Sequence, residues 1–511
     1  MKKDVKVMKI AYFLDVPKGL GGAGNLLLQR AYLMSECNDV VVVLPSDQDG
    51  CSSEEYAVRC TKYNMRYICI EYSTAYSFTI LDFMGAMESA AAIEKFAMEE
   101  KIDLFHSVQL NIAVEYVSRK LKIPHLMDIY SIHEGEFKIC KDNIYPKYHL
   151  CDSLIYSNMW REHLGVESRC IRPMAPIDSI RKKEKKNHRP IRILMLGIIW
   201  PYKNQLVAIK AVERCIKYYS NLELHILGLK GSSYSKMCEE YVKEKQLVNI
   251  VFFEGFISNI VPYLESSDCL LCTSTRESFP LSIVEAITYD LTIISTPVAG
   301  IPEVFVDKEN AFIAKDFSED SVVESILNYI EYCQNGKIDY IHRNAEQAWL
   351  KNFDRKLVIE QTESYYKAIV ENKNFESIEP FYTLKEKMKD MEAILTSIDS
   401  LGEDFIYNRV IYYSVVQKKL KKGKIYIWGA GKWGMVTLNI LRTLCPNLEI
   451  IAFIDNDRKG CIHNIPIKRP EDITCDRQYY YSVSFNVGRD EAIQYLENKG
   501  LKLFDNIWTL P

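Results

Sequence analysis

The stretch that decides the fold is residues 268–304, DCLLCTSTRESFPLSIVEAITYDLTIISTPVAGIPEV. It opens with an apolar run, DCLLCTS (268–274), and a second apolar run, LTIISTP (291–297), follows after a helical segment. Two short apolar runs separated by one amphipathic segment predict parallel strands joined by a crossover helix. Pro280 can open that helix, because the first helical turn does not need the N–H that proline lacks.

The same alternation continues on both sides of this unit. Near-continuous apolar strands that alternate with helices predict parallel sheets covered on both faces. The expected strands are 9–15, 39–45, 66–72, 103–109, 124–130, 153–157, 169–174, 191–197, 222–228, 250–256, 268–274, 291–297 and 310–316. We therefore expect an α/β protein with two doubly wound Rossmann-like domains, residues 1–180 and 190–353, that face a common ligand cleft.

The remaining segments differ in character. The charged stretch 180–190, IRKKEKKNHRP, is predicted to be a solvated linker, with a membrane-surface patch as the alternative. Residues 318–372 are predicted to be helical, and the polar stretch 373–422 is predicted to be a helical linker. A small α/β domain is expected over residues 423–511.

Composition limits the class of protein. Of the 511 residues, 48% are hydrophobic and 26% are charged, which excludes disorder over most of the chain. The net charge of -4 does not indicate a nucleic-acid partner. Apolar runs are too short for a membrane span, and the N-terminus lacks the cleavage site of a signal peptide. The 15 cysteines are scattered along the chain without a regular spacing, which favours free thiols in the cytoplasm over disulfides or a zinc site.

Two glycine-containing loops follow predicted strands and precede helices. The first, DVPKGLGGAGNLLLQ (15–29), contains Gly21 and Gly22, and such glycines let backbone amides approach an anion. A flexible tight turn is the alternative interpretation. The second, LGIIWPYKNQ (196–205), places Lys203 and Asn204 near a helix N-terminus, where a lysine is disfavoured unless an anion is present. An ordinary surface lysine is the alternative there.

The loop and helix of the deciding stretch add two carboxylates. Glu277 precedes the helix opened by Pro280, and Glu285 lies just over one turn inside it. An anion is favoured at the amides between them, from Phe279 to Ser282. A sugar nucleotide has the matching layout, with sugar hydroxyls on one side of a diphosphate and ribose hydroxyls on the other. Chance spacing of two common residues is the alternative.

Together these features resemble a known family. Residues 1–372 resemble the GT-B fold retaining glycosyltransferases of family 4. The features that carry the resemblance, in order, are GlyGlyAla at 21–23, the loop with Gly197, Lys203 and Asn204, SSD at 266–268, Glu277 and Glu285 as E-x7-E, and GIPE at 300–303.

The resemblance implies roles for individual residues. Glu277 would face the donor sugar, and Glu285 would bind the nucleotide ribose. The donor diphosphate would be held by the following residues: Gly21, Gly22, Lys203, Asn204, and the backbone of Phe279, Pro280 and Leu281. The helix over 354–372 would cross back to the N-terminal domain.

Two positions depart from the family pattern. Ile198 stands where an arginine is frequent, so diphosphate binding would rest on Lys203, backbone amides and Arg276. Tyr130 stands where a histidine near the reaction centre is frequent. The candidates for that role are Tyr130, His133, Asp128 and His106.

The resemblance also implies a reaction. It is transfer of a sugar from a nucleotide-diphosphate sugar with retention of configuration, by attack on the face that the leaving phosphate occupies, without a required cofactor or metal. The implied acceptor is a glycan or a lipid-linked molecule, in cell-surface polysaccharide or glycolipid biosynthesis. The basic N-terminus and linker suggest peripheral contact with the cytoplasmic membrane face.

The C-terminal segment carries a second signature. Gly429, Gly431 and Gly434 lie between a predicted strand and a helix, and Asp455 follows 21 residues after Gly434. This is the dinucleotide-fold fingerprint, so the segment resembles small Rossmann-like modules that bind a nucleotide or nucleotide sugar. A packing module without a ligand is the alternative. For the whole chain, the alternatives to a glycosyltransferase are a bifunctional enzyme with NAD-linked sugar chemistry and a non-catalytic sugar-nucleotide-binding protein.

Overall fold

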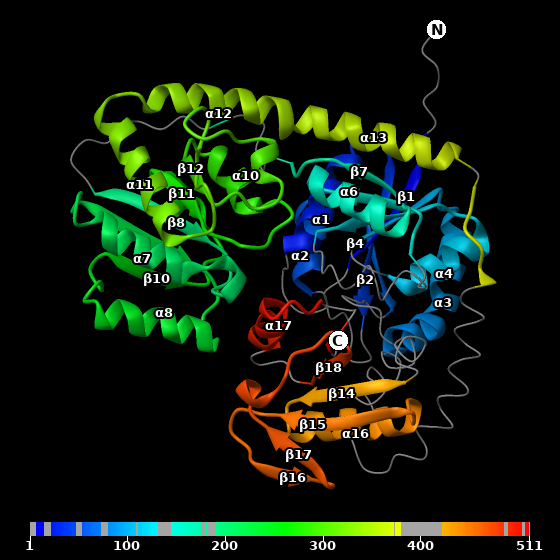
Figure 1. The fold of residues 1–511 in the computed structure, drawn as a ribbon. Coiled ribbons are helices and arrows are strands. Elements are labelled where there is room, and N and C mark those ends of the chain that lie inside the picture. Colours follow the sequence, from blue (N-terminus) through cyan, green and yellow to red (C-terminus); the bar gives the residue numbers. More distant parts are fainter. Residues whose placement is uncertain are drawn as a thin grey trace.

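The protein was analysed as a computed structural model, and the expected fold class is confirmed. The described residues form three separate β-sheets, each packed with helices in an α/β arrangement. Two of them follow one another along the chain, and the third lies near the C-terminus (Figure 1). The structure describes residues 7–14, 22–46, 54–72, 80–108, 111–130, 145–174, 180, 190–372, 374–379, 422–484, 489–502 and 506–509. The linker predicted over 373–422 falls almost wholly outside these ranges.

The N-terminal domain is built on a seven-stranded parallel sheet with the order β3-β2-β1-β4-β5-β6-β7. Apolar side chains cover both of its faces, as the near-continuous apolar strands predict. The strands are β1 (Lys9–Phe13), β2 (Asp39–Ser46), β3 (Tyr67–Glu71), β4 (Leu104–Val108), β5 (His125–Ile129), β6 (Tyr148–Cys151) and β7 (Glu167–Cys170). The helices are α1 (Gly22–Met34), α2 (Glu54–Lys62), α3 (Ile80–Glu100), α4 (Ile112–Leu121) and α6 (Leu154–Leu164).

The second domain repeats this plan with a six-stranded parallel sheet of order β10-β9-β8-β11-β12-β13. The strands are β8 (Ile191–Leu196), β9 (Leu222–Leu227), β10 (Val251–Gly255), β11 (Cys269–Cys272), β12 (Thr292–Ser295) and β13 (Phe312–Ile313). The helices are η1 (Pro201–Lys203), α7 (Gln205–Cys215), α8 (Ser233–Glu244), α9 (Val261–Ser266), α10 (Leu281–Ile287), η2 (Ile301–Glu303), α11 (Glu319–Gln334) and α12 (Ile338–Asn352). The deciding stretch supplies β11, α10 and β12, so the predicted crossover unit is present.

Helix α13 (Arg355–Glu371) continues from α12 and runs from the second domain to the first (Figure 1). Trp349 of α12 is buried in the core of the second domain. Tyr365 and Tyr366 of α13 are buried in the core of the first domain. The two helices therefore join the domains through packed aromatic side chains.

The C-terminal domain has a six-stranded sheet of order β16-β17-β15-β14-β18-β19, in which the β16–β17 pair is antiparallel. Its strands are β14 (Gly423–Trp428), β15 (Leu448–Ile454), β16 (Gly460–Ile462), β17 (Ile465–Lys468), β18 (Tyr479–Val483) and β19 (Ile507–Thr509). Its helices are α16 (Lys432–Leu444), η3 (Pro470–Asp472) and α17 (Arg489–Asn498). The glycine fingerprint spans the turn from β14 to α16, with Gly429 and Gly431 between the two elements and Gly434 in the first turn of α16.

One predicted strand is wrong. Residues 153–157 form the start of helix α6 (Leu154–Leu164), and the sheet is continued instead by β6 (Tyr148–Cys151). A run of about five apolar residues has no periodicity that separates a strand from a helical turn. Within the described residues, helices that combine the length and the apolarity needed to cross a bilayer are absent.

Candidate active site

The lysine and the first glutamate of the predicted donor site lie against each other. Lys203 ends η1, after β8, and Glu277 lies in the loop after β11, at the carboxyl edge of the second sheet. The Lys203 ammonium forms an ion pair with Glu277 Oε1, and Ser274 Oγ donates a 2.9 Å hydrogen bond to the same oxygen. The two charged side chains are 20% and 15% exposed, so they remain within reach of a ligand.

Local backbone geometry brings these two loops together. Gly197 has φ +133°, a conformation that favours glycine, and it ends β8 beside the Lys203 side chain. Asn204 has φ +56° and forms the turn between η1 and α7. The Thr273 hydroxyl donates to the carbonyl oxygens of Lys203 at 3.0 Å and Asn204 at 2.9 Å. The loops after β8 and β11 are therefore one hydrogen-bonded unit.

The charge of Lys203 is maintained in this setting. Burial alone would lower the pKa of Lys203, but the adjacent Glu277 carboxylate outweighs it and holds that pKa above its ordinary value. The ammonium is therefore positive at neutral pH. A fixed cation at this edge is suited to stabilise the negative charge of a departing diphosphate.

Helix α10 begins beside this pair with an uncapped N-terminus. Pro280 occupies the cap position and makes no side-chain capping bond to the first amides. The Phe279 ring is buried against Phe353, with ring centroids 5.3 Å apart, so Phe279 offers a ligand only its backbone. Gly22 faces the same place from the first domain, since a Cβ added there would lie 3.8 Å from Leu281 Cδ1.

Glu285 lies one turn into α10 and is half-buried. Burial raises the pKa of Glu285 to about 7. Among the described residues, no side chain or backbone amide donates a hydrogen bond to its carboxylate. An acceptor with this environment is open to donors supplied by a ligand.

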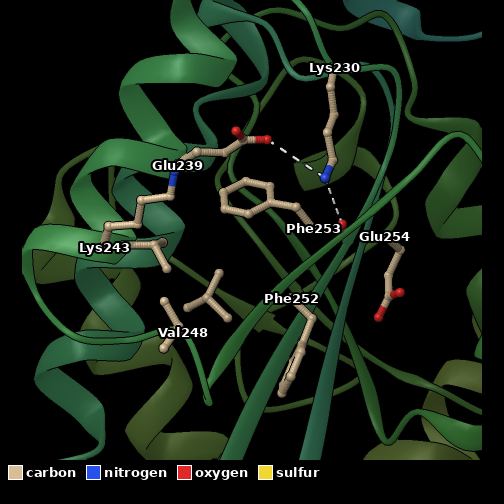
Figure 2. Close-up of a pocket in the computed structure, with 9 residues that line it drawn as sticks. Lys230, Glu239, Lys243, Val248, Phe252, Phe253 and Glu254 are labelled. Carbon is tan, nitrogen blue, oxygen red and sulfur yellow. Dashed lines mark hydrogen bonds and ion pairs between the residues drawn. The ribbon is translucent and has the colours of Figure 1, made fainter.

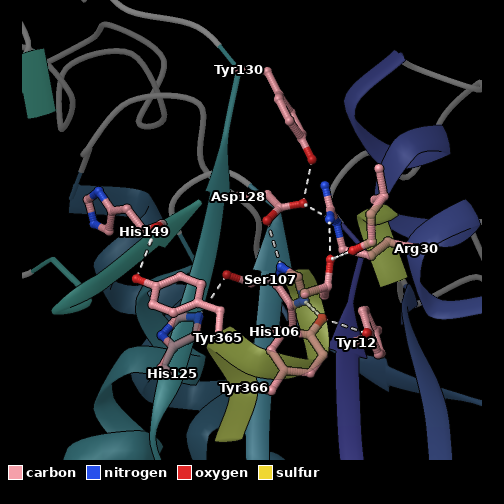
Figure 3. Close-up of polar contacts among 12 residues, drawn as sticks. Tyr12, Arg30, His106, Ser107, His125, Asp128, Tyr130, His149, Tyr365 and Tyr366 are labelled. Carbon is pink, nitrogen blue, oxygen red and sulfur yellow. Dashed lines mark hydrogen bonds and ion pairs between the residues drawn. The ribbon is translucent and has the colours of Figure 1, made fainter. Parts of the chain in front are cut away.

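In the first domain, Tyr130 is turned back toward the protein (Figure 3). Tyr130 directly follows β5, and its hydroxyl donates a hydrogen bond to Asp128 Oδ2. His106 Nε2 lies 2.7 Å from Asp128 Oδ1, and Arg30 Nε lies 3.5 Å from Oδ2. Burial opposes ionisation of Asp128, but His106 and Arg30 outweigh it and hold its pKa below the ordinary value. A buried carboxylate thus fixes the position of the Tyr130 hydroxyl.

This network extends into helix α13. The Tyr366 hydroxyl lies 2.6 Å from His106 Nδ1 and 2.6 Å from the Tyr12 hydroxyl, and Arg30 Nη1 donates to Thr362 Oγ1 at 3.0 Å. Both ring nitrogens of His106 are therefore used inside the protein, and burial lowers the pKa of His106. His106 supports Asp128 rather than facing a ligand.

A serine, a histidine and a glutamate nearby have the order of a hydrolase triad, and Figure 3 labels the serine and the histidine. Ser107 Oγ lies 2.7 Å from His125 Nε2, and His125 Nδ1 lies 2.9 Å from Glu115 Oε2. All three side chains are buried, with at most 3% of each residue exposed. Burial keeps a substrate away from Ser107, so the chain of hydrogen bonds is structural.

The other predicted residues are placed as follows. Gly21 and His133 lie outside the described residues, so their predicted roles stay predictions. Ile198 is 39% exposed beside the loop of Lys203. The Arg276 guanidinium lies 5.4 Å from the centre of the Tyr202 ring, next to the same loop. Groups of three or more His, Cys, Asp or Glu side chains suited to a metal do not occur within the described ranges.

In the C-terminal domain, the glycine fingerprint gives a close strand–helix contact. Gly429 has φ +103°, and a Cβ on Gly434 would lie 1.8 Å from the Gly429 oxygen. The Asp455 carboxylate accepts hydrogen bonds from the amides of Ala430, Asp457 and Arg458 at 2.8, 3.0 and 3.0 Å. Burial opposes ionisation of Asp455, but these amides hold its pKa below the ordinary value. Asp455 thus holds the glycine loop in place.

The sequence analysis missed one pair in this domain. Tyr495 and Lys499 have the Tyr-x-x-x-Lys spacing of catalytic pairs in NAD-linked chemistry. The Tyr495 hydroxyl donates a 2.9 Å hydrogen bond to the Pro470 oxygen, and the Lys499 ammonium lies 5.6 Å from the Tyr495 ring. The hydroxyl is thus committed to the backbone of η3.

A pocket of about 370 Å³ lies elsewhere on the second domain, between α8 and the edge strand β10 (Figure 2). Lys230 at its rim donates to the Phe253 oxygen at 2.8 Å and lies 3.6 Å from Glu239. None of the predicted donor-site residues lines this pocket. It is therefore separate from the site built around Lys203 and Glu277.

Two parallel-sheet domains with this edge site define a GT-B type of fold, and comparison with known proteins supports that class. Residues 176–346, most of which lie in the second domain, match the family model of the glycosyl transferases group 1, and this match supports a group 1 glycosyltransferase domain. The matched segment includes Lys203, Glu277 and Glu285.

Curated relatives and solved structures agree with this class. The chain is 27% identical over 140 residues to N-acetyl-alpha-D-glucosaminyl L-malate synthase of Bacillus anthracis, covering 26% of this chain and 35% of that protein. It is 25% identical over 206 residues to the Phosphatidylinositol N-acetylglucosaminyltransferase GPI3 subunit of Saccharomyces cerevisiae, covering 39% and 43%. The matches thus span less than half of these two relatives.

Among solved structures, Anabaena HepE in complex with UDP superposes with a TM-score of 0.57 at 17% identity, covering 71% of this chain and 100% of HepE. A glycosyltransferase from Rickettsia africae gives 0.58 at 16% identity, covering 72% and 100%. These two similarities show the fold. Together the comparisons support a transferase.

Proposed function

We propose that the chain is a retaining glycosyltransferase of family 4, which transfers a sugar from a nucleotide-diphosphate sugar to a glycan or lipid-linked acceptor. One observation carries the proposal. The Lys203–Glu277 pair lies beside the uncapped start of α10, and Glu285, whose carboxylate has no donor among the described residues, lies one turn further on. The Lys203 cation, the first amides of α10 and the two glutamate carboxylates then match the order of the sugar, the diphosphate and the ribose in a nucleotide sugar.

Each residue has a task in this scheme. Lys203 and the backbone around Phe279, Pro280 and Leu281 would stabilise the leaving diphosphate, with Gly21, Gly22 and Asn204 shaping the loops around it. Glu277 would accept hydrogen bonds from the donor sugar and orient it. Glu285 would accept hydrogen bonds from the ribose. Tyr130 and His133 would border the reacting carbon from the first domain.

The proposed retention of configuration is supported by where the charged side chains lie. Retention by double displacement would need a carboxylate nucleophile beneath the anomeric carbon. Glu277 is paired with Lys203 and Ser274, which suits an orienting role. We therefore favour attack on the leaving-group face, in which a diphosphate oxygen takes the proton of the acceptor hydroxyl. A metal is not required in this scheme, because Lys203 supplies the positive charge.

The cellular role is part of the proposal. We place the enzyme in the cytoplasm, in peripheral contact with the membrane face, in cell-surface polysaccharide or glycolipid biosynthesis. The named relatives support this direction, since one is a phosphatidylinositol N-acetylglucosaminyltransferase subunit. The organisation proposed is 1–180 for the acceptor, 190–353 for the donor, 354–372 as the crossing helix, and 423–511 as an accessory module.

For the accessory module we propose binding of a nucleotide or nucleotide sugar at Gly429, Gly431 and Gly434. The supporting observation is the Gly434–Gly429 contact, which brings the start of α16 close to the end of β14. Asp455 would bind a ribose only by sharing oxygens that already accept backbone amides. NMR titration of the full chain with UDP, NAD and nucleotide sugars, compared with Gly434→Ala, tests this proposal.

The main proposal is tested in two steps. UDP, GDP and their sugars are first screened for thermal stabilisation, because a ligand that binds the native state raises apparent stability. Hydrolysis of the stabilising donor is then followed for the wild type, Glu277→Gln and the exposed control Glu240→Gln. We expect turnover to fall in Glu277→Gln alone, to survive EDTA, and to release a sugar with the donor's anomeric configuration. Inversion, or complete loss with EDTA restored by Mn²⁺, would overturn the mechanism.

A further inference from the structure

Polar side chains meet across the boundary between the two large domains. Ser278 lies in the loop of the second domain between Glu277 and Phe279. Its hydroxyl donates a hydrogen bond to Asp152 Oδ1 of the first domain and lies 3.1 Å from Ser153 Oγ. Asp152, Ser153 and Ser278 are buried, with at most 3% of each residue exposed. The donor loop therefore contacts the first domain through buried polar side chains.

A second contact lies beside the first. Helix α6 has no capping bond from its own Ser153 side chain. The Glu303 carboxylate of η2, in the second domain, accepts from the amides of Leu154 and Ile155 at 2.8 and 2.9 Å. A carboxylate is favoured at a helix N-terminus by the free amides and the helix dipole. The second domain thus caps a helix of the first.

Arg172 links the two contacts. Its Nη2 donates to Glu303 Oε2 at 2.5 Å, and its Nη1 donates to the backbone oxygen of Asp152 at 2.8 Å. Close packing at Gly300 completes the contact between the domains, because a Cβ there would lie 2.9 Å from Ser153 Cβ and 2.7 Å from the Phe279 ring. Glycine is what lets the domains approach this closely.

We propose that Asp152 is a positioning residue that fixes the donor loop 274–282 through Ser278 when the two domains are in contact. Glu303 stabilises that contact between the domains. This inference rests on the proposed function only in calling that loop the donor loop. Asp152 touches no reacting atom in this scheme. It acts on the neighbours of Ser278, which are the orienting Glu277 and the backbone of Phe279.

The environment of Asp152 fits this role. Burial raises the pKa of Asp152 to about 7, although the Ser278 hydroxyl and Arg172 act in the opposite direction. A buried carboxyl that loses its hydrogen-bond partner still carries the free-energy cost of its removal from water. The hydrogen bond between Asp152 and Ser278 is therefore strongly favoured once the domains are in contact. Removal of either side chain should make the loop 274–282 more mobile.

The test combines hydrogen exchange with kinetics on the full chain, using Asp152→Ala, Ser278→Ala, the double variant and Asp152→Asn. We expect amide exchange across 274–282 to rise at least tenfold in each alanine variant, with the double variant no worse than the single ones, because the two residues act through one bond. Asp152→Asn keeps an acceptor and should restore protection. The rate of donor hydrolysis should fall about tenfold, with UDP affinity within twofold of wild type.

Unchanged exchange in the loop for both alanine variants, or additive effects in the double variant, would overturn the positioning role. Melting temperatures identify any variant that fails to fold, and Ser278→Ala then carries the test, since it removes one hydroxyl. Failure of the proposed function gives a different result. The wild type would then hydrolyse no donor, while the exchange pattern of the loop would still report on Asp152.

Discussion

Glu285 provides the sharpest test of the donor site, because its ionisation should be coupled to nucleotide binding. Burial raises its pKa to about 7 from an ordinary 4.5. Ribose hydroxyls donate hydrogen bonds and therefore favour the ionised carboxylate, so a bound nucleotide should lower this pKa. Binding then releases a proton whenever Glu285 starts protonated.

The size of the effect follows from the pKa. A carboxyl with a pKa of about 7 is about nine-tenths protonated at pH 6 and about one-tenth protonated at pH 8, so UDP should bind about tenfold more tightly at pH 8. Glu285→Gln cannot ionise and should lose this contribution. At pH 8 the variant should bind about 10- to 100-fold more weakly than wild type, since hydrogen bonds to charged groups contribute about 1.5–3 kcal/mol.

Calorimetric titration with UDP at pH 6, 7 and 8, in two buffers of different ionisation enthalpy, measures both affinity and proton release. UDP has a phosphate that titrates in the same range, and the identical titration of Glu285→Gln subtracts that contribution. The reasoning is refuted if wild type and Glu285→Gln show the same pH slope. It is also refuted if both proteins bind UDP equally well at pH 8.

Three further predictions concern other parts of the chain. Lys203→Ala should weaken UDP about 10- to 100-fold in calorimetry but leave uridine unchanged, because uridine lacks the phosphates that the ammonium would contact. Asp128→Asn should lower the free energy of unfolding in urea by about 3–5 kcal/mol, since it breaks a buried ion-pair network. As a control, Glu360→Gln, which removes a charge from an exposed pair, should lower the free energy of unfolding by less than about 0.5 kcal/mol. Gly434→Ala should destabilise the C-terminal domain by about 1–3 kcal/mol in the same assay, because its Cβ meets backbone, whereas Gly431→Ala should be nearly neutral.

The sequence predicted the fold class because apolar periodicity is local. Each strand of a parallel sheet buried on both faces is a short apolar run, and this signal located β8 to β12. The same signal misassigned residues 153–157, where the helix begins at Leu154. The capping group of that helix is Glu303, which is 149 residues away in sequence. No local pattern around Leu154 can contain that information.

For the candidate site too, local sequence patterns predicted some features and could not predict others. Motif spacing predicted Lys203, Glu277 and Glu285 as site residues, since each lies at a strand end or in the first turns of a helix. The pairing of Lys203 with Glu277 joins residues 74 positions apart and could only come from the folded sheet. Asp152 was not predicted at all, because its carboxyl gains its role from a partner in the other domain. The GIPE motif drew attention to Glu303 without indicating what it contacts.

Two carboxyls with raised pKa values lie near the loop 274–282: Asp152 contacts Ser278, and Glu285 is in the helix that follows. Burial raises the pKa of Asp152 and of Glu285 to about 7, from ordinary values of 3.8 and 4.5. A group whose pKa is raised by folding contributes stability that is complete below its unfolded pKa and is lost as the pH rises through the folded pKa. The folded protein therefore loses stability at both sites as the pH rises from about 4 to about 7, and the loss is complete above pH 7. At Glu285 a ribose would stabilise the ionised form, so the charge that weakens folding would strengthen binding. A half-buried position under no other demand would favour a residue without this ionisation cost, and this opposition of stability and binding is the physical argument for the ligand site proposed at α10.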